Sequence, residues 1–400
     1  MNRNLLILIA LFFLLVSSTK NKKTIKTLSV SDKEINTVVT PFKPLLFNED
    51  HNSEGFLATL KDGRILLIFR VDPSIKGDHV GRNGYIAKIM YDPEMDKWGD
   101  VKTVYNSNQY DDRNIHGGVT NDGKIIIFFR KFDGRETEGH YFIHSDDNGL
   151  TWSDPESYKI WSDPRVTDMK GNISTGKMFY NSDIKKYMML GFTYSQNSER
   201  NYTARKRCII YSRDGVSREE YNLIHDDANY KLNEIAGAWC GKNRILTLQR
   251  DDEREHGHPF VQIESYDNGQ TWTQPKQTNI PTNNHWGAAP QIIYNEKCDL
   301  FIALASDRYS RPDEQSSLFI YTARPNNIMG NPKNWTLQHE LLRPWAATNF
   351  KGDRPLNLNF YGYPTIAPIN DREYLIVFTK RSRMHGTEQA DLYYFKLIVN

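Results

Sequence analysis

Short runs of apolar, β-branched and aromatic residues recur along most of the chain, and turns rich in Gly, Asn and Asp separate them. In one example, residues 117–120 and 124–129 flank the turn Asn121-Asp122-Gly123. Runs of about four to eight such residues, bounded by turn residues, predict β-strands joined by hairpins. The pattern therefore predicts an all-β protein.

One turn sequence recurs along the chain. Residues 145–152 and 265–272 both follow the pattern S-x-D-x-G-x-T-W, residues 212–215 keep a shortened copy, and residues 96–98 and 334–336 keep eroded ones. We expect the Asp of each intact copy to accept backbone N–H groups within the turn, and the Trp to pack between sheets. The motif therefore stabilises the fold, and on its own it names no substrate.

The spacing of the repeating units predicts the fold class. The expected starts of the innermost strands are separated by 62, 58, 60, 51 and 76 residues, and they fall at Glu54, His116, Ser174, Glu234, His285 and Tyr361. Six units with such a period indicate a six-bladed β-propeller. Residues 37–47 are predicted to supply the outer strand of the last blade, beside the final strand at 391–399. This pairing would close the ring and remove exposed sheet edges.

The first residues differ in character from the rest of the chain. A short basic segment precedes an apolar run over residues 5–16, and small residues follow at 17–19. This order is typical of a secretory signal peptide, and the run is too short to span a bilayer. We therefore expect a signal peptide over residues 1–19, a linker over 20–35 and a single propeller domain over 36–400. The expected protein is secreted or periplasmic and has no membrane anchor.

Charge and cysteine content exclude several classes of protein. The formal net charge is +2, so bulk charge gives no reason to expect binding to nucleic acid or to a membrane. Three cysteines form one disulfide at most, which excludes a disulfide scaffold. His256-Gly257-His258 has no third ligand at a suitable spacing, so no metal or other cofactor is predicted.

The two intact turn motifs and the six units resemble the sialidase superfamily, whose β-propellers carry such turns as Asp boxes. The resemblance implies a sialidase-like fold over nearly all of residues 36–400, and it assigns roles to matching positions. Asp78, in Lys76-Gly77-Asp78-His79, corresponds to the acid/base Asp. Glu234 and Arg250 resemble a paired Glu and Arg, and Tyr363, in Tyr361-Gly362-Tyr363-Pro364, corresponds to the nucleophile.

The resemblance also concerns the arginines that hold the carboxylate of sialic acid. One of them would correspond to Arg308 or Arg311. Sialidases carry another in the first blade, within an Arg-Ile-Pro motif, where this chain has Ser53-Glu54-Gly55. An acidic residue stands where a cation is required, which speaks against sialidase activity and leaves the fold unaffected.

Arginines recur at one position of the repeating unit. The second strand ends with arginine in five of the six units, at Arg70, Arg130, Arg250, Arg308 and Arg381. These positions lie at the same mouth of the channel as the starts of the innermost strands, because adjacent strands are antiparallel. Guanidinium groups bind carboxylate and sulfate bidentately, so we predict an anionic sugar ligand. The alternative is that these arginines form ion pairs between blades, with Asp72, Asp133, Asp251 and Asp307.

Four further side chains are expected at this mouth: His116, Glu234, His285 and Tyr363. Each has a structural alternative. His116 fits a hydrogen-bonded histidine of an inner strand, Glu234 a buried carboxylate paired with Arg250, and Tyr363 a packed aromatic side chain.

Two chemistries fit these residues. In an elimination at a uronate, arginines neutralise the carboxylate, His116 or Tyr363 removes the C5 proton, and a second group protonates the departing C4 oxygen. In a sialidase-like hydrolysis, Tyr363 attacks the anomeric carbon, Glu234 takes its proton and Asp78 protonates the leaving oxygen.

We favour the elimination, of the lyase or dehydratase type, because the hydrolase lacks one arginine. The expected substrate is an acidic oligosaccharide or polysaccharide that contains uronic acid and can carry sulfate. A third hypothesis is a glycan-binding propeller without catalytic activity, which needs neither His116 nor Glu234.

Overall fold

The computed structural model describes the chain in the ranges 35–48, 50–73, 82–158, 170–173, 176–196, 202–225, 231–251, 259–281, 287–307, 317–341, 360–384 and 387–400. Residues Asn36–Asn400 form one compact unit. The expected signal peptide lies outside the described residues.

The described strands form five sheets, and one of them has ten strands because Ala390 pairs with His51 in parallel. We divide this sheet at that pair, call the resulting antiparallel units blades and number them in chain order. Blade 1 consists of β3 (His51–Thr59), β4 (Ile65–Asp72), β5 (Tyr85–Asp92), β6 (Lys97–Trp98) and β7 (Lys102–Tyr105). Blade 2 consists of β8 (Asp111–Val119), β9 (Ile125–Phe132), β10 (Thr137–Ser145) and β11 (Glu156–Ser157). Blade 3 consists of β12 (Lys170–Ile173), β13 (Phe179–Asn181), β14 (Lys186–Gln196), β15 (Tyr202–Ser212) and β16 (Glu220–His225).

The second half of the unit repeats this arrangement. Blade 4 consists of β17 (Leu232–Trp239), β18 (Ile245–Asp251), β19 (Val261–Ser265) and β20 (Lys276–Gln277). Blade 5 consists of β21 (Gly287–Asn295), β22 (Leu300–Asp307), β23 (Leu318–Ala323) and β24 (Thr336–Leu341), with the short helix α2 (Pro325–Ile328) before β24. Blade 6 consists of β25 (Phe360–Pro368), β26 (Glu373–Met384) and β27 (Thr387–Val399), joined by β1 (Thr37–Val39) and β2 (Lys43–Leu46). Within the described ranges, no helix is long and apolar enough to cross a membrane.

Blade 6 is completed by the beginning of the domain. Thr37 pairs with Val399 in β1, and Lys43 pairs with Tyr394 in β2, so two strands from one end of the domain lie against the strand from the other. The prediction that residues 37–47 pair with the final strand is confirmed. The pairing covers an edge of β27 that would otherwise be open.

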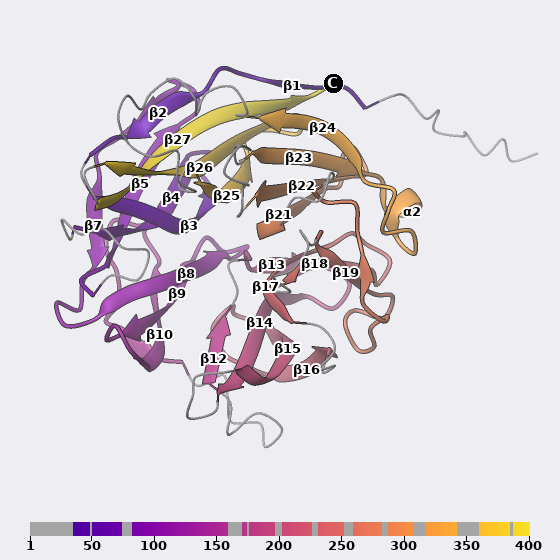
Figure 1. Cartoon of the computed structure of the whole chain (residues 1–400), viewed down its shortest axis with the longest axis horizontal. Helices are drawn as coiled ribbons and strands as arrows, with labels where there is room; N and C mark the ends of the chain where they lie inside the picture. The colour runs from indigo at the N-terminus through magenta and orange to yellow at the C-terminus, as the bar shows by residue number, and fades with distance from the viewer. Residues whose placement is uncertain are drawn as a thin grey trace, which may run out of the picture. The chain divides into compact units, whose positions relative to one another are not determined.

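The innermost strands contact one another in succession. β3 contacts β8, β8 contacts β12, β13 contacts β17, β17 contacts β21, β21 contacts β25, and β25 contacts β3. Figure 1 shows β21 and β25 toward the middle of the unit and outer strands such as β10 and β16 toward its rim. Lys177, which precedes β13 in blade 3, donates a hydrogen bond to the carbonyl of Ile366 in blade 6. The first strands of successive blades therefore lie next to one another.

The Asp boxes act as the turn pattern predicts. Asp147 accepts the backbone N–H of Thr151 at 2.9 Å and the Ser145 hydroxyl at 2.7 Å. In the second copy, Asp267 accepts the N–H of Thr271 at 2.8 Å. Trp152 packs against the apolar cluster between blades 1 and 2, and Trp272 packs against the cluster between blades 3 and 4. Both motifs therefore fix a turn and fill the gap between two blades.

Candidate functional site

The innermost strands carry an irregularity at corresponding positions. In β3, β8, β17, β21 and β25, the inner strand has one more residue than its partner strand, a β-bulge near its N-terminal end. The bulges fall between Ser53 and Gly55, Arg113 and His116, Leu232 and Ile235, Ala288 and Gln291, and Gly362 and Thr365. Bulges are common beside active sites, because the extra residue turns a side chain out of the regular alternation.

Four bulges contain a residue in the left-handed backbone region. The φ angles are 46° at Glu54, 54° at Asn114, 47° at Ala289 and 47° at Tyr363. Such a conformation costs of order 1–3 kcal/mol at a residue other than glycine and persists only where its surroundings enforce it. A bulky tyrosine in this region is uncommon. The bulges therefore mark one end of the inner strands as the candidate site.

Glu54 and Tyr363 lie at the same level of neighbouring strands. The backbone N–H of Leu57 in β3 donates to Oγ1 of Thr365 in β25 at 2.9 Å. Glu54 precedes Leu57 by three residues, and Tyr363 precedes Thr365 by two. The side chain of Tyr363 is half-buried. The residue that replaces the first sialidase arginine therefore lies beside the strand that carries the predicted nucleophile.

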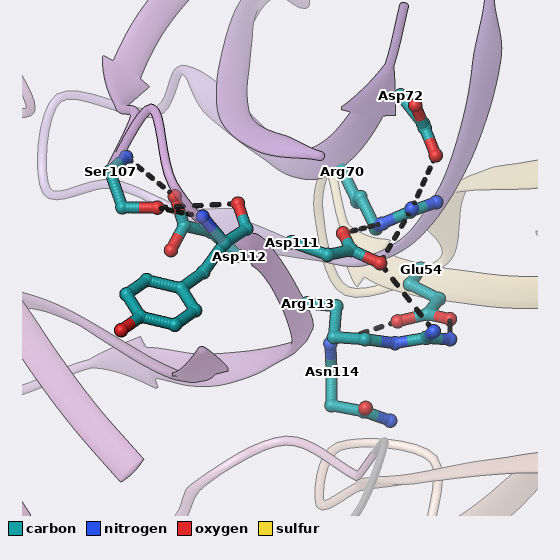
Figure 2. A network of polar contacts seen from close by, with 9 residues as sticks. Glu54, Arg70, Asp72, Ser107, Asp111, Asp112, Arg113 and Asn114 are labelled. Atoms are coloured by element: carbon teal, nitrogen blue, oxygen red, sulfur yellow. Dashed lines mark hydrogen bonds and ion pairs between the residues drawn. The ribbon is translucent and has the colours of Figure 1, made fainter. Parts of the chain in front are cut away.

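Glu54 is held by blade 2. Its Oε1 is 3.0 Å from Nη2 of Arg113, and its Oε2 accepts the backbone N–H of Asn114 at 2.9 Å (Figure 2). Burial disfavours the charged carboxylate, but the guanidinium groups of Arg113 and Arg70 and the Asn114 N–H outweigh it and lower the pKa of Glu54 to about 2. Glu54 is therefore ionised at neutral pH.

Arg70 has carboxylates on two sides. Its Nε and Nη2 contact the two oxygens of Asp111 at 2.6 and 2.8 Å, and Nη2 also donates to Asp72 at 2.9 Å. The side chains of all three residues have no exposed surface. For Arg70 the structure favours the alternative of an ion pair between blades over binding of substrate. Asp111 also lies 3.5 Å from Nη1 of Arg113, so the ion pairs run from Asp72 to Glu54.

The other predicted arginines differ in their surroundings. Arg130 is half-buried, donates to Thr137 Oγ1 at 2.9 Å, and lies with its guanidinium carbon 4.9 Å from the ring centre of Phe132. Its charge contributes to the low pKa of Glu54. Arg250 Nη1 lies 3.3 Å from Oε1 of Glu234, as the resemblance implies for this pair.

Glu234 repeats the contacts of Glu54. Its Oε2 accepts the backbone N–H of Ala289, the left-handed residue in the bulge of the next blade, at 2.7 Å. Its side chain is 11% exposed, against 2% for Glu54. The fold therefore places two carboxylates by the same backbone contact, and the one on β17 keeps more access to solvent.

His116 lies within the interface of blades 2 and 3. Its ring stacks on Phe128 at a centroid distance of 5.3 Å, and Nδ1 is 3.0 Å from the carbonyl oxygen of Asn114. A carbonyl only accepts, so Nδ1 carries the proton. Burial lowers the pKa of His116 to about 3, so the ring is neutral. This arrangement favours the structural alternative for His116, a hydrogen-bonded histidine of the inner strand.

Several predicted residues lie outside the described part of the chain. These are Asp78, His285 and Arg308. Arg381 lies on β26, where its backbone pairs with Phe360 and Ala390. Among the described residues, no group of three or more His, Cys, Asp or Glu side chains could hold a metal ion.

Sequence reasoning missed the residues that surround Glu54. Asp111, Asp112 and Arg113 lie at the start of β8, ahead of its bulge. Asp112 faces away from Glu54 and accepts the N–H of Ser107 at 2.8 Å (Figure 2). Burial outweighs this contact and raises the pKa of Asp112 to about 7. The sequence feature that could have identified these residues is the run of three charged residues at the start of a predicted strand.

The sequence profile of the BNR repeat-like domain family matches residues 82–366. The chain therefore belongs to the sialidase-like BNR-repeat family, and the predicted resemblance is confirmed. A sialidase from Paraclostridium sordellii is 24% identical over 292 residues, which cover 65% of this chain and 68% of that protein.

Solved structures agree on the fold. A protein of unknown function from Dyadobacter fermentans has a TM-score of 0.73 at 15% identity, and the match covers 91% of this chain and 100% of that one. The intramolecular trans-sialidase of Ruminococcus gnavus has a TM-score of 0.60 at 11% identity, with 88% and 96% covered. At these identities the similarity shows an all-β, sialidase-like β-propeller fold. Activity is a separate question, because it depends on the site.

Proposed function

We propose that this protein is a glycoside hydrolase on a closed six-bladed propeller, with Tyr363 as nucleophile and Glu234 as the base that activates it. The observation that carries the proposal is the placement of Glu234. Its carboxylate is fixed by the Ala289 N–H and by Arg250, yet it remains partly exposed, and Tyr363 occupies the corresponding bulge of β25.

The proposed reaction has two steps. In the first, Oη of Tyr363 bonds to the anomeric carbon, its proton passes to Glu234, and the bond to the aglycone oxygen breaks as an acid protonates that oxygen. The family resemblance assigns the acid to Asp78. In the second step, water attacks the anomeric carbon, its proton returns to the acid, and the tyrosine oxygen leaves and regains its proton from Glu234.

We prefer hydrolysis to an elimination that uses His116 as its base and Arg70 as its cation. Elimination needs a base that reaches the C5 proton and a cation that neutralises the uronate. His116 is stacked on Phe128 within an interface, and Arg70 is enclosed by carboxylates. The comparisons lend elimination no support, whereas the relative from Paraclostridium sordellii is named a sialidase.

A glycoside screen tests the proposal. The purified protein is incubated with neutral and acidic aryl glycosides and oligosaccharides, and products are identified by mass spectrometry. We expect hydrolysis of at least one glycoside, with Tyr363→Phe and Glu234→Gln inactive. Tyr141→Phe is the matched control, because the Tyr141 hydroxyl contacts Glu138 on the outer strand β10.

Two outcomes contradict the proposal. A rise in near-ultraviolet absorbance during turnover indicates an unsaturated sugar and restores elimination. Binding of a glycan without turnover of any glycoside indicates a binding module. We also propose that the mature protein begins after the expected signal peptide and is exported.

A further inference from the structure

We propose that the substrate carries no carboxylate on the part that faces blades 1 and 2, and that Glu54 and Arg113 together set this preference. The preferred class is a glycoside that presents hydroxyl or amide groups there. The inference rests on the proposed function, because it assigns the substrate class of the same site.

The position of Glu54 places it beside any sugar that reaches Tyr363. Strands β3 and β25 contact each other, and the hydrogen bond from Leu57 to Thr365 sets their register. The bulges of the two strands therefore face the same space from adjacent blades. A substituent on the blade 1 side of the sugar ring points toward Glu54 and Arg113, which are almost entirely buried.

The charges around Glu54 balance. Arg113 donates to Glu54 and also lies near Asp111, and Arg70 is held by Asp111 and Asp72. Among the described side chains that act on Glu54 or on Arg70, there are three guanidinium groups and three carboxylates, namely those of Arg70, Arg113, Arg130, Glu54, Asp72 and Asp111. The charges of these six side chains therefore sum to zero, and they give an incoming anion no net attraction.

The two donors nearest Glu54 are already in use, and the Nε of Arg113, which has no hydrogen-bond partner among the described residues, is buried. The Arg113 side chain is 4% exposed, and Glu54 occupies both its Nη2 and the backbone N–H of Asn114. A substrate carboxylate would have to displace Glu54, whose own charge would then lie uncompensated beside it. Like charges at such separations repel, and burial increases the repulsion. Uncharged hydroxyl and amide groups incur no such repulsion.

The first experiment uses acetate as the smallest carboxylate probe and acetamide as its neutral analogue. Thermal unfolding of wild type is compared with that of Glu54→Ala and of Glu54→Ala/Arg113→Met, at constant ionic strength. Removing the Glu54 side chain opens space beside Arg113 and Asn114, so we expect acetate to stabilise Glu54→Ala. Acetate should bind this variant at least about tenfold more tightly than wild type. The double variant should not respond, because its cation is absent.

The second experiment compares methyl glucuronide with its amide by titration calorimetry on the wild-type protein. We expect the amide to bind at least about tenfold more tightly than the acid. Stronger binding of the acid overturns the inference. So does an equal response to acetate in wild type and Glu54→Ala.

The two proposals fail separately. If no glycoside is hydrolysed, the acetate comparison still tests whether Glu54 excludes a carboxylate. If hydrolysis requires Tyr363 but wild type binds acetate as tightly as Glu54→Ala, only the inference about substrate charge is wrong.

Discussion

Glu54 and Glu234 occupy the bulges of two different blades, and both accept the backbone N–H of the left-handed residue in the following described bulge. They differ in their arginines and in their exposure. Glu54 forms an ion pair with Arg113 of the neighbouring blade, and its side chain is 2% exposed. Glu234 forms an ion pair with Arg250 from the adjacent strand of its own blade, and its side chain is 11% exposed.

The difference shows that the same contact, from a carboxylate to the N–H of a left-handed bulge residue, occurs with two different degrees of burial. Between blades 1 and 2, Glu54 belongs to a group of buried ion pairs, and its negative charge compensates the positive charge of Arg113. On blade 4 the carboxylate contacts Arg250 among the described residues, and its side chain is 11% exposed. The fold supplies the position of both groups, and the two carboxylates differ in burial.

The largest expected effect concerns Glu234, the less buried of the two carboxylates. Glu234→Gln should lower kcat about 10²- to 10⁴-fold, because a glutamine accepts the Ala289 N–H but cannot take the proton of Tyr363. Steady-state kinetics on a glycoside that wild type cleaves measures the effect. An unchanged kcat would show that Glu234 is as structural as Glu54.

Glu54→Gln should act on stability. It leaves the charge of buried Arg113 without its closest carboxylate, so we expect the free energy of unfolding to fall by about 3–5 kcal/mol. Urea unfolding measures it. Replacing Arg113 as well, in Glu54→Gln/Arg113→Met, should recover part of the loss. Equal stability of wild type and Glu54→Gln would contradict a buried ion pair.

Gly84 tests the neighbouring pair of Arg70 and Asp111. A Cβ at Gly84 would lie 2.0 Å from Oδ1 of Asp111 and 2.6 Å from Nε of Arg70. Gly84→Ala should therefore cost about 1–3 kcal/mol in unfolding free energy. Gly99→Ala is the matched control in the same blade, because its Cβ would meet only the Met90 carbonyl, at 3.6 Å. Equal unfolding midpoints for the two variants would contradict the close approach.

Asp112 and Glu54 should give opposite dependences of stability on pH. Glu54 has its pKa lowered from 4.5 to about 2, so its contribution is full above pH 4.5 and is lost as the pH falls toward 2. Asp112 has its pKa raised from 3.8 to about 7, so the folded state binds the extra proton and stability falls as the pH rises from 3.8 toward 7.

Asp112→Asn should remove the second dependence. We expect this variant to be more stable than wild type by at least about 1 kcal/mol at pH 8, and equally stable near pH 4. Urea unfolding across this range measures the difference. A loss of stability at pH 8 would show that the Asp112 charge is favourable in the fold.

The smallest effect concerns the Asp-box turn. Asp267→Asn weakens its contacts to Thr271 on the outer side of blade 4. We expect Tm to fall by about 2 °C, the change that roughly 1 kcal/mol causes in a domain of this size, and kcat to stay within twofold of wild type. A large loss of turnover would connect this turn with the site.

The sequence predicts those parts of the fold that depend on local patterns. The Asp boxes are found because Asp147 and Asp267 contact residues two and four positions away. The pairing of residues 37–47 with the final strand follows from the need to cover a sheet edge. The family resemblance adds the pairing of Glu234 with Arg250.

The contacts between blades are harder to predict. Asp72, one of the acidic partners considered for the arginines, does contact Arg70, but the bidentate partner of Arg70 is Asp111 from the next blade. Asp133, another expected partner, instead accepts the N–H groups of Arg135 and Glu136 in its own turn. Such partners are set by the packing of one blade on another, which strand periodicity does not encode.

The bulges limit what the alternation of strand residues predicts about side chains such as His116. One extra residue in a strand moves every following side chain to the other face of the sheet. The bulge of β8 lies between Arg113 and His116, so strand alternation alone does not give the face on which His116 lies. The left-handed residues Glu54 and Tyr363 gave no warning either, since left-handed positions are commonly occupied by Gly, Asn or Asp.

The role of Tyr363 as nucleophile is tested most directly by peptide mass spectrometry. The protein is first incubated with a fluorinated glycosyl fluoride of a sugar that wild type cleaves. Such a compound accumulates the covalent intermediate. We expect a glycosyl adduct on the peptide that contains Tyr363 in wild type, and no adduct in Tyr363→Phe. An adduct on another residue, or turnover that continues in Tyr363→Phe, would contradict the assignment of Tyr363 as the nucleophile.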